Sequence, residues 1–218
     1  MANHHPTDDL LIRHSAGQLP NALGIIVACH IEQCTQCQQK IAVYDQLGGE
    51  LLVQNDELSP ANLSVKADLL EDTLAKLDQP LPDEKTIQPV SDSAIPGPLR
   101  RFIPCKLSQI KWRGFAKGIK EISLGFSNGH YSAKLYKISP NKLLPVHTHK
   151  GNEFTFVMQG SFSDNAGCYR AGDFIQTDPS IIHQPKASDY QACICFAVTD
   201  APLKFTGLFT RLLNPFLR

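Results

Sequence analysis

A proline-rich segment divides the chain into two parts. Residues 78–98 read DQPLPDEKTIQPVSDSAIPGP, with five prolines among 21 residues and no periodic apolar pattern. Such composition is typical of an extended, semi-rigid linker, because proline interrupts both helices and inner strands. The sequence therefore predicts a linker over 78–98, with one domain at 1–77 and a second at 99–218.

The two parts differ in charge. Residues 1–80 hold 4 basic and 11 acidic side chains, whereas residues 81–218 hold 17 basic and 10 acidic ones, so the chain as a whole has no net charge. An acidic domain is repelled by the phosphates of nucleic acid and attracted to basic protein surfaces. We therefore expect the N-terminal part to bind a protein that contacts DNA, and not to bind nucleic acid directly.

Hydrophobicity and cysteine usage exclude two classes of protein. The longest apolar run, residues 23–29 with one glycine inside it, is far shorter than the roughly 20 residues that cross a bilayer. The start of the chain, MANHHPTDDL, is polar and acidic, unlike a secretion signal. Seven scattered cysteines do not resemble a disulfide framework. These features predict a cytoplasmic protein without a membrane partner.

The N-terminal part has the periodicity of helices. Thr7 is a suitable N-cap for a short helix over about 7–17. From Pro20 onward, apolar and metal-capable residues recur at alternating spacings of 3 and 4, which indicates one amphipathic helix or two joined by a short break. A further apolar face at 64–77 leads us to expect a small helical bundle.

Three residues on this helical stripe have the spacing of metal ligands. The stretch HIEQCTQC places His30, Cys34 and Cys37 on one face. A C-x-x-C pair and a histidine one turn earlier supply three of the four donors that zinc requires, so a fourth has to come from elsewhere. We expect a structural zinc site. The alternative is that these residues are two small core residues and a hydrogen-bonded histidine.

The periodicity of the C-terminal part is that of strands. Short segments rich in β-branched and aromatic residues, such as 131–138, 154–158 and 193–198, alternate with turn residues about every 8–12 positions. This pattern is typical of a β-sandwich or β-barrel.

A second set of metal-capable residues lies among these strands. His147 and His149 are two apart and so share one face of a strand, Glu153 follows four residues later, and His183 lies in a later segment. Nitrogen and oxygen donors of this kind suit zinc, manganese, iron, nickel or copper. We expect a metal site on the inner face, the alternative being incidental histidines near a strand end.

The order of these motifs resembles that of one known family. The pattern H-x-H-x3-E-x6-G at 147–160 is similar to the first cupin motif, and residues 172–183 are similar to the second. Four residues depart from the usual cupin pattern: Asn141, Asp178, Ser180 and Ala187. With the H-H-x-x-D-x-L-L segment at 4–11, the zinc-type helix and the linker, the chain resembles ChrR-type anti-sigma factors over nearly its full length.

The resemblance implies an α+β protein of two domains, a small zinc-stabilised helical bundle at 1–77 and a cupin β-barrel, or double-stranded β-helix, at 99–218. It implies that the ligands of the structural zinc are His5, His30, Cys34 and Cys37. A second divalent metal, zinc or else manganese, iron or nickel, would be held in the cupin by His147, His149, Glu153 and His183.

The function implied by the resemblance is that of an anti-sigma factor and not of an enzyme. The N-terminal domain would hold an extracytoplasmic-function sigma factor inactive, and the cupin would sense an oxidative stress, such as singlet oxygen or a peroxide, and cause release. Two alternatives stay open. One is a metal-dependent cupin dioxygenase or isomerase with an appended zinc module, and the other is a switch in which oxidation of Cys34 or Cys37 expels zinc.

Two further cysteines are candidates for a part in the response. Cys193 and Cys195 are two apart on an expected strand, so both thiols point into the barrel or both point away from it. Small apolar residues filling the core are an equally good interpretation of this pair.

Overall fold

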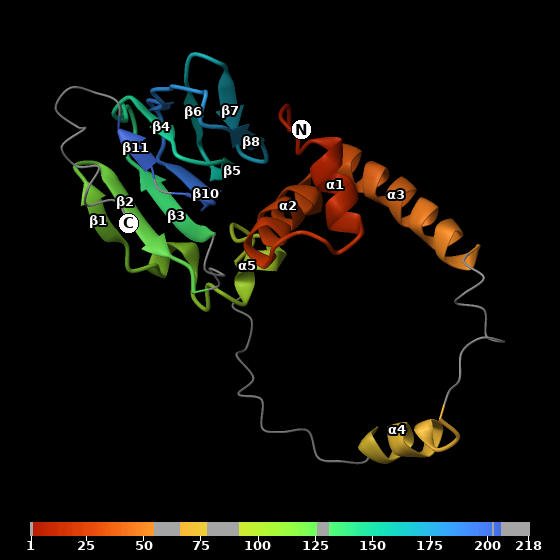
Figure 1. Cartoon of the computed structure of the whole chain (residues 1–218). Helices are drawn as coiled ribbons and strands as arrows, with labels where there is room; N and C mark the ends of the chain where they lie inside the picture. The colour runs from red at the N-terminus through yellow and green to blue at the C-terminus, as the bar shows by residue number, and fades with distance from the viewer. Residues whose placement is uncertain (1, 55–65, 78–91, 126–130, 202, 206–218) are drawn as a thin grey trace.

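A helical N-terminal part packs against a part built of β-sheets (Figure 1). The structure is a computed structural model, and it describes residues 2–54, 66–77, 92–125, 131–201 and 203–205. This arrangement confirms the predicted α+β fold class.

Four of the described helices belong to the N-terminal part: α1 (Asp8–Ser15), α2 (Asn21–Gln33), α3 (Thr35–Val53) and α4 (Leu69–Leu77). The Thr7 hydroxyl accepts the N–H of Leu10 and caps α1, as its position before two acidic residues predicted. The long stripe forms two helices, because Cys34 adopts an extended conformation between α2 and α3. Among the described residues, no helix combines the length and hydrophobicity needed to cross a membrane.

α2 is the central helix of the molecule. It packs against α1 and α3 on one side and against a short helix, α5 (Gly97–Arg100), and the strands β5 and β10 on the other. Its buried residues are Ala22, Leu23, Ile25, Ile26, Val27, Cys29 and His30. A helix that is apolar nearly all round is buried on nearly all sides. One hydrophobic core therefore continues from the helical part into the sheets.

α4 differs from the other helices, since each of its residues is exposed and it stands apart from them in Figure 1. The apolar face expected at 64–77 does form over Leu69–Leu77, but within the part of the chain that the structure describes no helix or strand buries it. The expectation that this segment joins the bundle is therefore wrong, because an amphipathic pattern does not specify which surface will cover it. Residues 64 and 65 lie outside the described residues.

The described residues of the C-terminal part form three antiparallel sheets. The largest has the order β1-β2-β3-β10-β5-β8, formed by Arg113–Ala116, Ile119–Ser123, Ser132–Ile138, Cys193–Thr199, Glu153–Gln159 and Phe174–Thr177. The smaller sheets are β11-β4 (Leu203–Phe205, His147–His149) and β7-β6-β9 (Cys168–Arg170, Ser161–Ser163, Lys186–Ala187). These described strands do not close into one continuous barrel, yet residues from all three sheets line one cavity.

The end of the expected linker is folded. Residues 78–91 lie outside the described residues, but Ile95 and Leu99 are buried in the core beside α2. The N–H of Gly97 donates to the Glu32 carboxylate at 2.9 Å. Pro96 is the N-cap of α5 and Pro98 lies in its first turn. Proline is well suited to the first turn of a helix, so these prolines do not prevent the segment from folding. The domain boundaries at 77 and 98 stay predictions.

Candidate metal centres

Four metal-capable side chains meet where α2 joins α3; we name this cluster of His5, His30, Cys34 and Cys37 the first centre. Their donor atoms lie within 4.8 Å of one another. His5 Nδ1 is 3.3 Å from His30 Nε2 and from the Sγ of Cys34, and 3.5 Å from the Sγ of Cys37. A tetrahedral zinc ion with bonds of about 2.0–2.3 Å holds its donors about 3.3–3.8 Å apart. The spacing therefore fits a four-coordinate ion.

The break between the two helices produces this geometry. His30 lies in the last turn of α2, Cys34 is the N-cap of α3, and Cys37 lies in the first turn of α3. Both cysteines therefore lie at the N-terminus of α3, next to the end of α2. His5 reaches the cluster from the segment that precedes α1.

Burial sets the protonation states in the first centre. It lowers the pKa of His30 to about 4, so the imidazole is neutral near pH 7 and has a lone pair for a metal. Burial, assisted by the neighbouring Cys34, raises the pKa of the Cys37 thiol to about 12. A buried thiol of this kind ionises only beside a cation. Together with Cys34 and His5, these two side chains form a set of two sulfur and two nitrogen donors, which fits zinc.

The second cluster lies on the inner side of the sheets; we name His147, His149, Glu153 and His183 the second centre. The Nε2 atoms of His147 and His183 are 3.0 Å apart. His149 Nε2 is 3.5 Å from His183 Nε2 and 3.1 Å from the Oε2 of Glu153. The three histidines form one group of converging donors, and Glu153 contacts that group through His149. The structure thus brings together all four residues that the sequence singled out.

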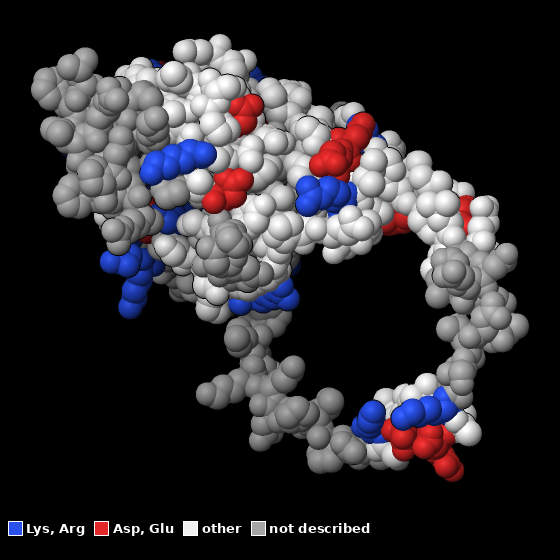
Figure 2. Space-filling model, viewed as in Figure 1, with Lys and Arg blue, Asp and Glu red and all other residues white. Residues whose placement is uncertain are grey.

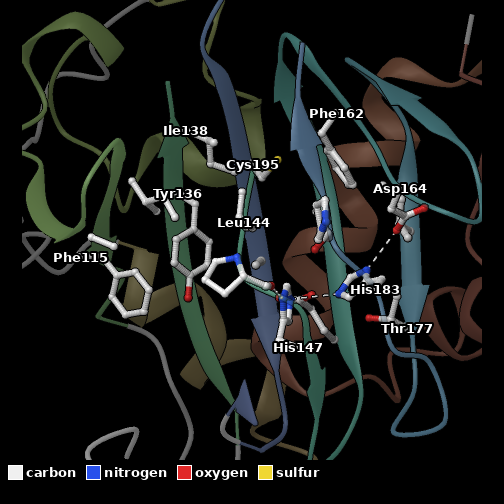
Figure 3. Close-up of a pocket in the computed structure, with 18 residues that line it drawn as sticks. Phe115, Tyr136, Ile138, Leu144, His147, Phe162, Asp164, Thr177, His183 and Cys195 are labelled. Atoms are coloured by element: carbon white, nitrogen blue, oxygen red, sulfur yellow. Dashed lines mark hydrogen bonds and ion pairs between the residues drawn. The ribbon is translucent and has the colours of Figure 1, made fainter. Parts of the chain in front are cut away.

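Hydrogen bonds from the outward-facing ring nitrogens orient two of these histidines. His147 Nδ1 donates to the carbonyl oxygen of Pro145 at 2.7 Å. His183 Nδ1 donates to the buried carboxylate of Asp164 at 3.0 Å, as the dashed line in Figure 3 shows. Both contacts leave Nε2 free of a proton and directed at the cluster, which is the usual arrangement of metal-binding histidines. Asp164 was not recognised from the sequence, where it is one acidic residue in a turn.

The protonation states of the second centre also suit a cation. Desolvation opposes ionisation of Glu153, but the hydrogen bond and proximity of His149 outweigh it and hold the pKa of the carboxyl below its usual range. Burial lowers the pKa of His147. A carboxylate with three imidazoles fits a divalent metal, although these donor types do not select zinc over manganese, iron or nickel.

An apolar cavity of about 290 Å³ opens beside the second centre (Figure 3). His147, Glu153 and His183 form its polar end. The apolar side chains of its wall include those of Phe115, Ile119, Ile138, Leu144, Phe162 and Ile175. The second centre is therefore within reach of a small molecule.

Cys193 and Cys195 lie on the cavity side of β10. Both are buried, their sulfur atoms are 3.5 Å apart, and Cys195 lines the cavity. The hydrogen bond with Cys193 and burial raise the pKa of the Cys195 thiol well above its usual value. A protonated thiol is a weak nucleophile, so Cys195 lies in the wall of the cavity without being a reactive thiol.

Comparison with known proteins agrees with these observations. Residues 101–202 match the family model described as the ChrR cupin-like domain. The chain is 33% identical over 219 residues to the anti-sigma-E factor ChrR of Cereibacter sphaeroides, and the match covers 99% of this chain and 98% of that relative.

A solved structure resembles the whole molecule. It is the crystal structure of Rhodobacter sphaeroides SigE in complex with the anti-sigma ChrR, with a TM-score of 0.78 and 30% sequence identity, and it covers 92% of this chain and 100% of the matched chain. Both of these relatives are anti-sigma factors. Because the similarity includes the helical part, the cupin part and their order, the chain belongs to the family of ChrR-type anti-sigma factors.

Proposed function

We propose that this chain binds an extracytoplasmic-function sigma factor through its N-terminal helical part and keeps it inactive in the cytoplasm. The observation that carries the proposal is the similarity over nearly the whole chain to ChrR, which a solved structure contains in complex with SigE. A cupin enzyme would account for the cupin part of the chain only. It would not account for a similarity that includes the helical part.

Exposed apolar side chains on α3 and α4 supply a surface for the partner. α3 exposes Val43, Leu47, Leu51, Leu52 and Val53, and α4 exposes Leu69, Leu70, Leu74 and Leu77. Apolar residues gathered on solvent-facing helices are typical of a surface that another protein covers. In Figure 2 the visible surface of α3 is mostly uncharged, and α4 presents acidic side chains with basic ones beside them.

Charge supports the same partner. Residues 1–80 hold 11 acidic and 4 basic side chains, among them Glu71 and Asp72 in the first turn of α4. A sigma factor needs basic surfaces to contact DNA, and acidic residues around an apolar surface accelerate association with such a partner. Inhibition would follow from covering the surfaces that the sigma factor uses.

An aspartate on the outer face of α3 is expected to weaken sigma binding strongly. Leu47 is 57% exposed, so Leu47→Asp leaves the fold intact. It removes an apolar contact worth about 2 kcal/mol and places a charge in the interface, which together correspond to a loss of affinity of roughly 100-fold. Titration of the purified sigma factor measures this loss.

The matched control for that substitution is Ala42→Asp. Ala42 is also exposed, and the helical repeat places it on the side of α3 away from Leu47. The same charge there is expected to leave sigma affinity nearly unchanged. Equal affinities of the Leu47→Asp chain and the unmodified chain would show that α3 is not the binding surface.

We further propose that zinc in the first centre is structural and that the cupin part senses oxidative stress. All four positions of the first centre are protein donors, which leaves none for water or substrate. The second centre, in contrast, is within reach of a small molecule, since it lies at the polar end of a cavity. Cys195 forms part of the wall of that cavity. A change at this metal, caused by singlet oxygen or a peroxide, would shift the conformational equilibrium of the chain toward the state that releases the sigma factor.

The thiol-based alternative places the switch in the first centre instead. Oxidation of Cys34 or Cys37 would expel zinc and open the helical part. Cys34 and Cys37 are both buried, which slows their oxidation. The second centre, by contrast, lies at the polar end of a cavity, and this access favours it as the sensor.

A further inference from the structure

The first centre is completed by a turn of the cupin part. Gly172 lies between β7 and β8 with a φ of +95°, a conformation that favours glycine. Its carbonyl oxygen is 2.8 Å from His30 Nδ1. A carbonyl oxygen only accepts hydrogen bonds, so Nδ1 of His30 carries the proton. The lone pair is then on Nε2, which lies 3.3 Å from the Sγ of Cys37. The cupin thus selects the metal-binding tautomer of His30.

The next residue of this turn holds the segment that carries His5. Asp173 Oδ1 accepts the backbone N–H of Asn3 at 2.6 Å and of His4 at 3.2 Å, while Oδ2 accepts the N–H of Arg170 at 2.8 Å. The N–H of Phe174 donates in return to the carbonyl oxygen of His4 at 3.0 Å. The Asp173 side chain is almost fully buried. One turn, residues 170–174, therefore contacts His30 directly and the backbone beside His5.

The same turn leads to the second centre. β8 begins at Phe174 and ends at Thr177, which pairs with Glu153 on β5. Thr177 also lines the cavity. At the other end of β8, the ring of Phe174 packs against the His30 ring with centroids 6.0 Å apart. A strand of four residues thus separates the two centres.

We propose that the turn 170–174 positions two of the four zinc ligands, so that zinc binding and docking of the cupin part stabilise each other. The inference deepens the proposed function and rests on the zinc site assigned there. Coupling of this kind is reciprocal. A change that displaces the turn lowers the affinity for zinc, and loss of zinc weakens the contacts between the turn and the helical part. A displacement of β8 caused at the second centre would reach the helical part through these hydrogen bonds.

The test substitutes the buried carboxylate in the full chain. Asp173→Asn keeps the size of the side chain but replaces one acceptor oxygen with a donor. Loss of a group that holds metal ligands in place typically costs about 10- to 100-fold in metal affinity, and we expect zinc transfer to a chromophoric chelator to accelerate by about that factor. The visible spectrum of Co²⁺ bound in the first centre, which reports ligand geometry, should change as well. If Asp173 only stabilised the fold and did not position the zinc ligands, the Co²⁺ spectrum of the folded Asp173→Asn chain would be unaltered.

The control is Asp92→Asn. Asp92 also accepts two backbone N–H groups, from Ala94 at 3.0 Å and Leu107 at 2.7 Å, but contacts neither centre. Zinc transfer from this variant is expected to match that of the unmodified chain.

A second measurement needs no substitution. Hydrogen exchange is followed in the unmodified chain with zinc bound and after its removal by a chelator. The amide of Phe174 should exchange faster once zinc is lost, whereas that of Leu135, on β3, should not. Unchanged zinc transfer in the Asp173→Asn chain, unchanged exchange at Phe174, or absence of zinc from the unmodified chain would each overturn the proposal. None of these readouts involves the sigma factor, so a failure to bind one would contradict the proposed function alone.

Discussion

Replacing both cysteines of the first centre by alanine is expected to remove one metal ion per chain and to unfold the helical part. Cys37 is the only one of the 19 residues of α3 that is buried, so the contact of α3 with the rest of the molecule depends heavily on this centre. Structural zinc sites contribute about 10–16 kcal/mol of apparent binding free energy, as much as the whole stability of a typical domain. Metal analysis, far-UV circular dichroism and limited proteolysis of the Cys34→Ala, Cys37→Ala chain measure the effect.

Another buried cysteine supplies the control for this prediction. Cys29 lies in α2 and is fully buried, but it does not belong to the first centre. Cys29→Ala should retain both metal ions and the helical signal. If the double variant held as much zinc as the unmodified chain, the first centre would not be a zinc site.

Removing donors from the second centre is expected to abolish release of the sigma factor and leave its binding unchanged. His147 and Glu153 lie in the cavity of the cupin part, on the far side of β5 and β8 from the first centre. The His147→Ala, Glu153→Ala chain should therefore form the complex with normal affinity. Exposure to a photosensitiser in light, or to an organic peroxide, should then fail to restore transcription in a reaction that contains the sigma factor and RNA polymerase.

A charged residue elsewhere in the cupin part serves as the control. Asp189 is exposed and pairs with Lys186 at 3.3 Å, away from the cavity. Asp189→Ala should release the sigma factor as the unmodified chain does. Normal release from a chain that lacks the cupin metal would contradict the sensing role and favour the thiol-based alternative at Cys34 and Cys37.

Local patterns predicted the helical character of the N-terminal part, the strands β3, β5 and β10, and the residues of both centres except His5. Spacing placed His30, Cys34 and Cys37 together because the three lie close in the sequence on one helical stripe. It could not decide between one helix and two, since that choice depends on the backbone at Cys34. His5 followed only from the resemblance, because the contacts that bring its segment to the cluster involve Asp173, about 170 residues away in the chain.

The features that the sequence did not reveal depend on tertiary contacts. Gly172 and Asp173 look like an ordinary turn before a strand, and only the folded chain shows that this turn contacts His30 of the first centre. The orientation of Cys195 was left open, because the pattern of a strand does not say which face is inside. The exposure of the apolar face of α4 could not be predicted either, because the partner proposed to cover that face is another protein.

The central claim is tested most directly by titrating the zinc-containing full chain into a transcription reaction with an extracytoplasmic-function sigma factor of its own organism. The account predicts a one-to-one complex and loss of transcription from that sigma factor's promoter once the two proteins are equimolar. A chain that carries zinc yet forms no complex with any such sigma factor, and leaves transcription unchanged, would contradict it.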